Sequence, residues 1–147
     1  MKCKLCKKEF ISNRGSYFWV EGKLKSYCGN CSSKIEKMSN LPEVMIVPIT
    51  MKNFLEVIKK KIYAHPITYG RKGGKNIAFY ISAPKSAITH IAEVKTIIKE
   101  KQKKIYLLGK IKRLKYPILR GNYSAIQGTK NTTIKKINKA KFIQELK

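Results

Sequence analysis

All four cysteines of this chain lie near its start, in two Cys-x-x-Cys pairs. Cys3 and Cys6 form the first pair and Cys28 and Cys31 the second, with the spacing C-x2-C-x21-C-x2-C. Each pair can reach one metal ion from a tight turn, and four thiolates in a tetrahedron suit Zn2+. Because four protein ligands leave no position for water, the pattern predicts one structural zinc ion rather than a catalytic one. A redox dithiol and an iron–sulfur cluster remain open as alternatives.

The cysteines also bear on where the protein works. The lysine-rich first residues are not followed by a long apolar run, which argues against a secretory signal. Nor does the sequence contain an apolar stretch of about 18 residues that could span a membrane. We therefore expect a cytoplasmic protein, whose clustered thiols stay reduced and bind metal rather than form disulfides.

The charge balance indicates the kind of partner. The chain has 33 lysines and arginines against 8 acidic residues, a net charge of +25, and it has no aspartate. A chain rich in lysine and isoleucine can reflect an AT-rich genome, but that does not explain the missing aspartate. A polyanionic partner does. We expect nucleic acid, with a membrane surface well behind it.

The residues around the cysteines predict a small zinc finger over residues 1–38. Such a unit is too short to fold on a hydrophobic core alone, so metal binding must supply folding energy. Between the pairs, SYFWVEGKLKSYC predicts a hairpin around Glu21-Gly22. After the second pair, SSKIEKM predicts a helix with Cys31 or Ser32 near its N-cap. This order resembles a treble-clef zinc finger, with a plain zinc ribbon as the alternative.

A short polar segment with Pro42 separates the finger from a larger domain over residues 44–147. The larger domain shows, in order, a buried strand, a helix, a turn-rich basic loop, three long strands, an irregular segment and a closing helix. The predicted strands cover residues 44–50, 77–82, 87–98 and 104–114. Strands outnumber helices and the neighbouring ones are joined by short turns. We therefore predict an α+β protein whose larger domain is a small antiparallel or mixed barrel with flanking helices.

Helical spacing predicts one buried face on each of the two helices. The apolar residues of the first face are Met51, Phe54, Leu55, Ile58 and Ile62. Those of the closing helix are Ile134, Ile137, Phe142 and Leu146. Thr50 is the expected N-cap of the first helix, and a threonine or asparagine that of the second.

The stretch IAFYISAPKSAITHIAEVKTI, residues 77 to 97, resembles the strand pair of the PUA-like superfamily, in particular its ASCH and EVE branches. The stretch IQGTKNTTIKKINKAKFIQEL resembles the closing turn and helix of archaeal relatives. The resemblance covers roughly residues 44–147 and implies a barrel that binds RNA or a modified base, commonly between the barrel strands and the early helix. The sequence departs from it at His90, where the family has a small residue. It also has IKKKIYAHPITYGR in place of the Gly-x-Lys-x-x-Glu-x-Arg signature of ASCH proteins.

Two basic clusters that contain aromatic residues are candidate nucleic-acid contacts. The first is the glycine-rich loop around residues 69–75, whose backbone can approach a phosphate. The second follows the last long strand, where arginine can bind phosphate or a guanine edge through two hydrogen bonds and tyrosine can stack on a base. The candidates are Tyr69, Arg71, Lys72, Lys75, Lys85, Arg113, Arg120, Tyr123 and Gln127. Lys115 and Tyr116 also belong to the second cluster.

Neither of the two histidines is a strong catalytic candidate. His90 falls within a predicted strand, where a packed side chain is expected. His65 precedes Pro66 in a predicted loop, as a structural turn residue would.

Three functions are consistent with these patterns. The first is a non-catalytic nucleic-acid-binding protein, for which the family resemblance favours RNA over DNA. The second is an enzyme: some ASCH proteins resemble amidohydrolases of acetylated nucleosides, and Lys61, Thr68 and Glu93 are the nearest counterparts of their Lys, Thr and Glu. The third is a structural protein bound to the ribosome or another complex. We expect the first, with one structural zinc ion and no catalytic residue.

Overall fold

The computed structural model describes residues 2–4, 6–9, 15–20, 23–32, 35, 40–67, 73–121 and 130–146. The N-terminal unit, residues 2–35, contains the antiparallel strands β1 (Gly15–Val20) and β2 (Lys23–Cys28), with Val20 opposite Lys23. The predicted hairpin is therefore confirmed. The short helix α1 (Gly29–Ser32) begins two residues before Cys31, so that cysteine lies within the helix and not at its N-cap.

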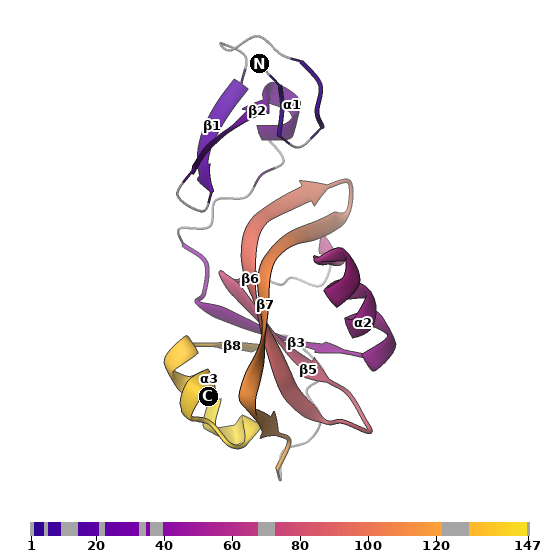
Figure 1. Ribbon diagram of the computed structural model, residues 1–147, viewed down its shortest axis with the longest axis vertical. Helices are drawn as coiled ribbons and strands as arrows, with labels where there is room; N and C mark the ends of the chain where they lie inside the picture. Colours follow the sequence, from indigo (N-terminus) through magenta and orange to yellow (C-terminus); the bar gives the residue numbers. More distant parts are fainter. Residues whose placement is uncertain are drawn as a thin grey trace.

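The rest of the described chain is built on one mixed six-stranded sheet, in the order β4-β7-β6-β5-β3-β8. Its long strands are β6 (Ala87–Glu100) and β7 (Lys103–Leu119), which form an antiparallel hairpin with several register shifts. Next to β6 lies β5 (Asn76–Ile81), which pairs in parallel with β3 (Val44–Ile49). Figure 1 shows that the hairpin bends over its length, and that its turn lies at the end nearest the N-terminal unit. The predicted α+β class and mixed sheet are confirmed.

Two short edge strands escaped the sequence prediction. β4 (Ile62–Pro66) pairs with β7, and β8 (Lys130–Thr132) pairs with β3. β4 lies where we expected the end of a helix followed by a loop. β7 also continues five residues beyond its predicted end at residue 114. Strands this short do not show a period-two pattern that can be recognised in the sequence. Their place at the edge of the sheet depends on pairing with a strand that is distant in the chain.

Helices cover the two faces of the sheet, each over a separate apolar core. α2 (Met51–Lys60) lies on one face, and α3 (Ile134–Lys139) with the 3-10 helix η3 (Ile143–Leu146) lies on the other, as Figure 1 shows. The α2-side core includes Phe54, Phe79 and Tyr106, all buried. The α3-side core is formed mainly by the alternate residues of the same strands, as the two-residue period of a strand requires.

The predicted N-caps of both helices are present. Thr50 Oγ1 accepts a hydrogen bond from Asn53 N at 3.3 Å, and Thr133 Oγ1 accepts one from Lys136 N at 3.3 Å. Glu43 adds a charged acceptor at the start of α3, since its Oε1 accepts from Ile134 N at 2.8 Å. A carboxylate is favourable there because the first backbone N–H groups of a helix lack intrahelical partners.

The predicted buried face of α2 is wrong in most of its members. Phe54 and Val57 are buried, whereas Met51, Leu55 and Ile58 are exposed to 40%, 58% and 38%. Ile62 belongs to β4 and is also exposed. A ten-residue helix that rests on a curved sheet contacts it through one row of side chains, so the other apolar side chains of the helix remain exposed to solvent. On the C-terminal side, Ile137 and Leu146 are buried as predicted, but Ile134 and Phe142 are largely exposed.

Candidate metal centre and basic surface

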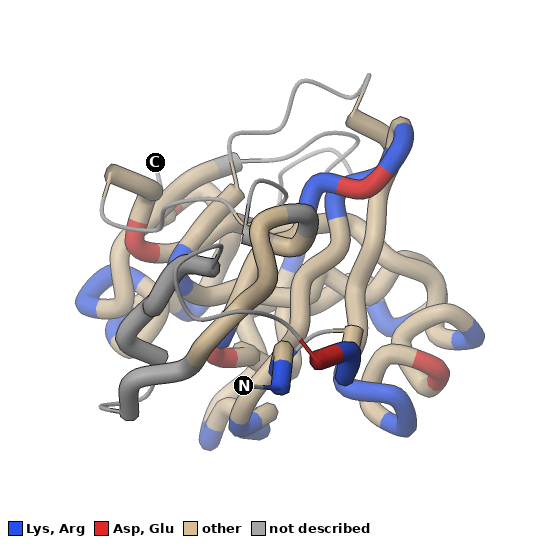
Figure 2. Tube along the Cα trace, turned by 90° about the horizontal axis from the view of Figure 1, so that it is seen from above, with Lys and Arg blue, Asp and Glu red and all other residues tan. Residues whose placement is uncertain are grey.

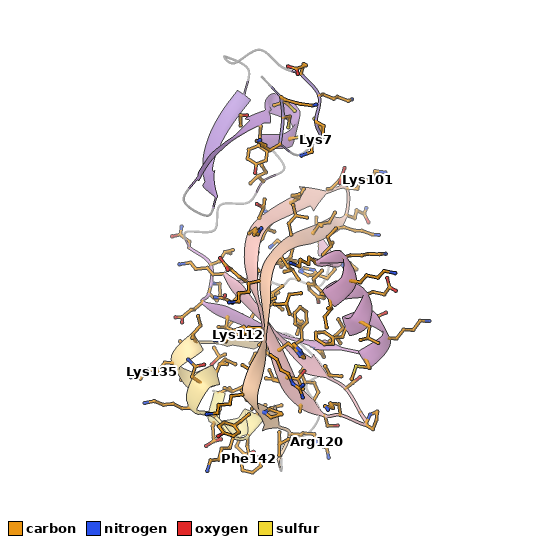
Figure 3. The ribbon with its side chains drawn as sticks, in the orientation of Figure 1. Lys7, Lys101, Lys112, Arg120, Lys135 and Phe142 are labelled. Carbon is orange, nitrogen blue, oxygen red and sulfur yellow. The ribbon has the colours of Figure 1, made fainter. Side chains whose placement is uncertain are left out.

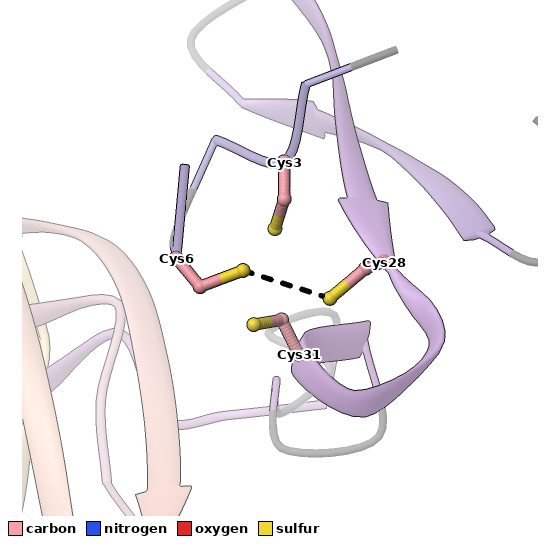
Figure 4. A group of neighbouring side chains, drawn as sticks. All are labelled: Cys3, Cys6, Cys28 and Cys31. Carbon is pink, nitrogen blue, oxygen red and sulfur yellow. Dashed lines mark hydrogen bonds between the residues drawn. The ribbon is translucent and has the colours of Figure 1, made fainter. Parts of the chain in front are cut away.

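The first cysteine pair lies on a backbone turn. Cys3 N donates to Lys8 O, and Lys7 N donates to Cys3 O, each at 3.0 Å, while Lys7 adopts a left-handed conformation with φ of 64°. The second pair spans the end of β2 and the helix α1. The two local structures face each other, so that all four side chains converge, as Figure 4 shows.

The four sulfur atoms have the separation of a tetrahedral metal site. All lie within 4.8 Å of one another, and the sulfurs of Cys6 and Cys28 are 3.8 Å apart. A tetrahedral zinc with Zn–S bonds of about 2.3 Å would hold neighbouring sulfurs about 3.8 Å apart. All four cysteines are free thiols rather than disulfides. The four residues therefore form a cluster that can hold one metal ion.

The pKa of Cys31 indicates that such a cluster needs a bound cation. Burial, and then the neighbouring thiols, raise the pKa of Cys31 to about 12. A thiolate at this position is therefore costly unless a cation accompanies it, and a bound metal ion deprotonates coordinating thiols. The chemistry of the donor set thus fits a thiophilic divalent cation.

The cysteine cluster is packed against the six-stranded sheet through a few specific contacts. Tyr27, one residue before Cys28, is buried, and its hydroxyl shares a side-chain hydrogen bond with Thr96 of β6. Ile35 forms an isolated antiparallel bridge with Ile98 on the same strand. Burial raises the pKa of Tyr27, while the Thr96 hydrogen bond acts in the opposite direction. β6 therefore positions the residues next to the metal ligands.

Some of the candidate nucleic-acid contacts lie outside the described residues. These are Tyr69, Arg71, Lys72, Tyr123 and Gln127, and they remain predictions from the sequence. Lys75, Lys85, Arg113 and Arg120 are described and are all exposed. Figure 2 shows lysine and arginine at turns and strand ends around the trace, with few acidic positions among them.

The described glycines of the first basic loop have a packing role. Gly73 and Gly74 are both buried. A Cβ at Gly74 would lie 2.9 Å from the backbone N and the Cβ of Met45 and 2.9 Å from Asn76 O. Close approach of two backbones, and not an open phosphate cradle, therefore accounts for glycine at this position.

A basic cavity of about 360 Å³ lies beside β6, β7 and the start of α3. Four cations from one strand line it: Lys110, Lys112, Arg113 and Lys115. Glu93 is the one acidic residue in its lining, and Asn76 and Asn138 add amide groups. All four cations come from β7, which shifts register against β6 on both sides of Ile111–Arg113. The sequence patterns predicted contacts at Arg113 and Lys115 here but not at Lys110 and Lys112, which lie within a predicted strand.

Arg113 also influences a histidine across the hairpin. His90 pairs with Arg113 in the β6–β7 register, and its ring lies 4.9 Å from that of Phe54. Partial burial, and then the charge of Arg113, lower the pKa of His90. The Nδ1 atom of His90 lies 2.8 Å from Thr89 Oγ1. His90 is therefore a packed strand residue, as expected.

His65 differs from expectation. It lies in β4 and is buried, with its Nε2 atom 2.9 Å from the hydroxyl of Tyr106 and its Nδ1 atom 2.9 Å from Pro66 O. It lines a second cavity, of about 460 Å³, with residues of β3, α2 and β4. Burial alternates along IYAHP but the apolar and polar residue types do not, so the sequence carries no period-two signal for this strand.

No protein-family model matches the sequence, and a search of curated proteins finds no significant match. Among solved structures, the chain is similar to a mutant of the ASCH protein from Zymomonas mobilis, with 12% sequence identity and a TM-score of 0.51. That match covers 67% of this chain and 96% of the Zymomonas chain. Two further structures of the Zymomonas protein match with TM-scores of 0.47 and 0.48, at 13% identity; they cover 63% and 66% of this chain, and 90% and 95% of theirs.

The six-stranded part of the chain therefore has the fold of the Zymomonas ASCH protein, and a cysteine cluster precedes it. No helix in the described part of the chain is long and apolar enough to cross a bilayer.

Proposed function

We propose that this protein is a non-catalytic RNA-binding protein of the cytoplasm. Its basic ASCH-like barrel would hold RNA, and a structural zinc ion would fold the N-terminal unit. The proposal favours RNA over DNA for two reasons: the fold is that of ASCH domains, and exposed aromatic residues beside cations suit unstacked bases. A ribosome is one setting in which such a protein would act.

The observation that carries the proposal is the cation row of β7. Lys110, Lys112, Arg113 and Lys115 surround one cavity with a single acid in its lining, on a chain of net charge +25. Cations gathered around one cavity can neutralise neighbouring phosphates, and each neutralised phosphate releases counterions. A chain of phosphates is the ligand that this arrangement suits best.

Zinc is the proposed metal because the donors are four thiolates at tetrahedral spacing. The ion would contribute folding energy to a unit whose core contains few residues, among them Cys3, Tyr27 and Cys31. Four protein ligands leave it no open position for substrate, so we assign it no part in chemistry.

The enzyme alternative has less support from the geometry. Glu93 is exposed and lines the basic cavity, whereas Lys61, at the C-terminal end of α2, is not among the residues that line that cavity. Thr68 lies outside the described residues. If acetylcytidine were hydrolysed by the purified protein and the activity were lost in Glu93→Ala, the non-catalytic assignment would be wrong.

The direct test is fluorescence anisotropy of the zinc-loaded protein with single-stranded RNA, matched single-stranded DNA and duplex RNA, across a salt series. We expect RNA binding that weakens with salt yet still prefers one RNA form at about 150 mM, beyond the general phosphate contribution. Equal binding to all three nucleic acids that vanishes with salt would contradict the proposal. Co-sedimentation with ribosomes at moderate salt would identify the ribosome as the site of action.

A further inference from the structure

A larger cavity lies next to the basic one, between the C-terminal half of β7 and α3. It has a volume of about 650 Å³, within the range of small-ligand sites. We call it the β7–α3 groove. Its lining includes Lys115, Tyr116, Leu119, Lys139, Lys141 and Phe142.

The walls of this groove expose large apolar side chains. Tyr116 is 72% exposed, Leu119 50% and Phe142 38%. Single exposed apolar residues are normal on a protein surface, but several gathered around one concavity indicate a binding site. Figure 3 shows Phe142 and Arg120 at the same end of the sheet, where β7 finishes.

Phe142 is held in place by several backbone contacts. It forms a bridge with Leu119, and Leu119 N donates to Lys141 O at 2.9 Å. The carboxylate of Glu145 accepts from Lys141 N and Phe142 N, both at 2.7 Å. A Cβ added to Gly121 would lie 2.9 Å from Phe142 Cδ1, so the ring packs directly against that glycine. A ring fixed in this way loses little conformational freedom on binding.

Lysines lie around the exposed apolar side chains of the groove. Lys115, Lys139 and Lys141 line the groove, and none of the described residues that line it is acidic. Lys115 Nζ lies 5.5 Å from the centre of the Tyr116 ring, which brings a cation beside the exposed aromatic face. An occupant must therefore offer a flat apolar surface together with negative charge.

We infer that the β7–α3 groove takes an unpaired base of single-stranded RNA. The base stacks on Tyr116 or Phe142, and the adjoining phosphates lie against the lysines. This inference rests on the proposed RNA-binding function and narrows it to single strands. Bases of a duplex are stacked on one another inside the helix, so their faces are not available to Tyr116 or Phe142. An acidic peptide with an aromatic residue is the competing occupant.

The test measures anisotropy of full-length zinc-loaded protein with three probes at one salt concentration: single-stranded RNA, duplex RNA, and an abasic strand of equal length with the same phosphates. The variants are Tyr116→Ala, and Phe142→Leu, which preserves apolar packing. Tyr116→Phe retains the ring, and Leu55→Ala removes an exposed apolar side chain from α2, on the other face of the sheet. Thermal melting checks that each variant is folded.

We expect Tyr116→Ala to weaken single-strand binding about 5- to 100-fold, because stacking contributes about 1–3 kcal/mol per base. Phe142→Leu should also weaken single-strand binding. In both variants, binding to duplex RNA and to the abasic strand should stay at the wild-type level. Tyr116→Phe keeps a stacking ring and should bind the single strand more tightly than Tyr116→Ala does, and Leu55→Ala should behave as wild type.

If both groove variants bind the single strand as tightly as wild type does, the groove assignment is overturned and the RNA-binding function stands. The same holds if an acidic peptide binds the groove and does not compete with RNA. If wild-type protein binds none of the RNA probes, the proposed function itself fails.

Discussion

Tyr27, one residue before a cysteine of the metal cluster, shares a side-chain hydrogen bond with Thr96 in the middle of β6. Both residues are buried, and 68 residues of chain separate them. The contact lies between the hairpin that ends at the metal ligand Cys28 and the hairpin whose second strand carries the basic row. This hydrogen bond therefore attaches the N-terminal unit to β6.

This contact predicts a measurable coupling. Tyr27→Phe removes one hydroxyl and leaves Thr96 with one partner fewer, which should lower the free energy of unfolding by about 1 kcal/mol. Urea unfolding of the zinc-loaded protein measures it, with Tyr116→Phe as the exposed-hydroxyl control. A double-mutant cycle with Thr96→Val that gives no interaction energy would show that the two side chains do not depend on each other.

Metal removal should unfold the N-terminal unit and leave the six-stranded sheet intact. The unit has a core of few residues, and four thiolates this close together would repel one another without a cation among them. We expect one zinc per chain by elemental analysis, four thiols that react slowly with Ellman's reagent, and fast reaction after chelation. Cys28→Ser should bind zinc far more weakly. Iron in the native protein, or rapid thiol reaction before chelation, would contradict the zinc assignment.

The cation row of β7 should determine the salt dependence of RNA binding. Lys112→Gln and Arg113→Gln each remove one exposed charge from the basic cavity. Each should reduce the slope of log K against log salt by about 0.7 for a single strand, if that cation neutralises one phosphate. Lys59→Gln, in α2 on the opposite face of the sheet, serves as the charge-matched control. A slope reduced equally by all three variants would mean that the attraction is spread over the whole surface.

Acid should destabilise the protein through His90. Its pKa is lowered by partial burial and then by Arg113, so the unfolded chain takes up a proton at higher pH than the folded one does. The stabilisation is present above the unfolded pKa of about 6.5 and is lost as the pH falls through the lower folded pKa. His90→Gln should flatten the stability profile below about pH 6.5. An unchanged profile in urea unfolding across this range would indicate that His90 titrates equally in both states.

Gly74 should tolerate no side chain. A Cβ there would lie 2.9 Å from backbone atoms of Met45 and Asn76, so β3 and β5 would have to move apart. Gly74→Ala should destabilise the fold by about 1–3 kcal/mol, as overpacked core positions do. Thermal melting measures the effect, and Ala83→Gly, in the exposed turn between β5 and β6, is the control for a small change outside the core. A melting temperature equal to that of wild type would show that the two strands can relax.

The sequence determined the local features of this protein. The cysteine spacing identified the four residues that converge, because each Cys-x-x-Cys pair closes within one turn of backbone. Thr50 identified the start of α2, and a threonine or asparagine cap was expected for the closing helix, since capping depends only on residues three positions apart. The long apolar strands and the stretch from residue 77 to 97 predicted the mixed sheet and the ASCH fold, which the structure confirms.

Only the tertiary structure decided how distant segments meet. The edge strands β4 and β8 exist because β7 and β3 offer them partners, and His65 is buried because Tyr106 lies across that pairing. Several apolar side chains of α2 are exposed because a curved sheet can cover only a small part of a short helix. The β7–α3 groove joins Tyr116 to Phe142, 26 positions later. Periodicity reports which residues of one segment share a face, but the partner of that face depends on contacts between segments.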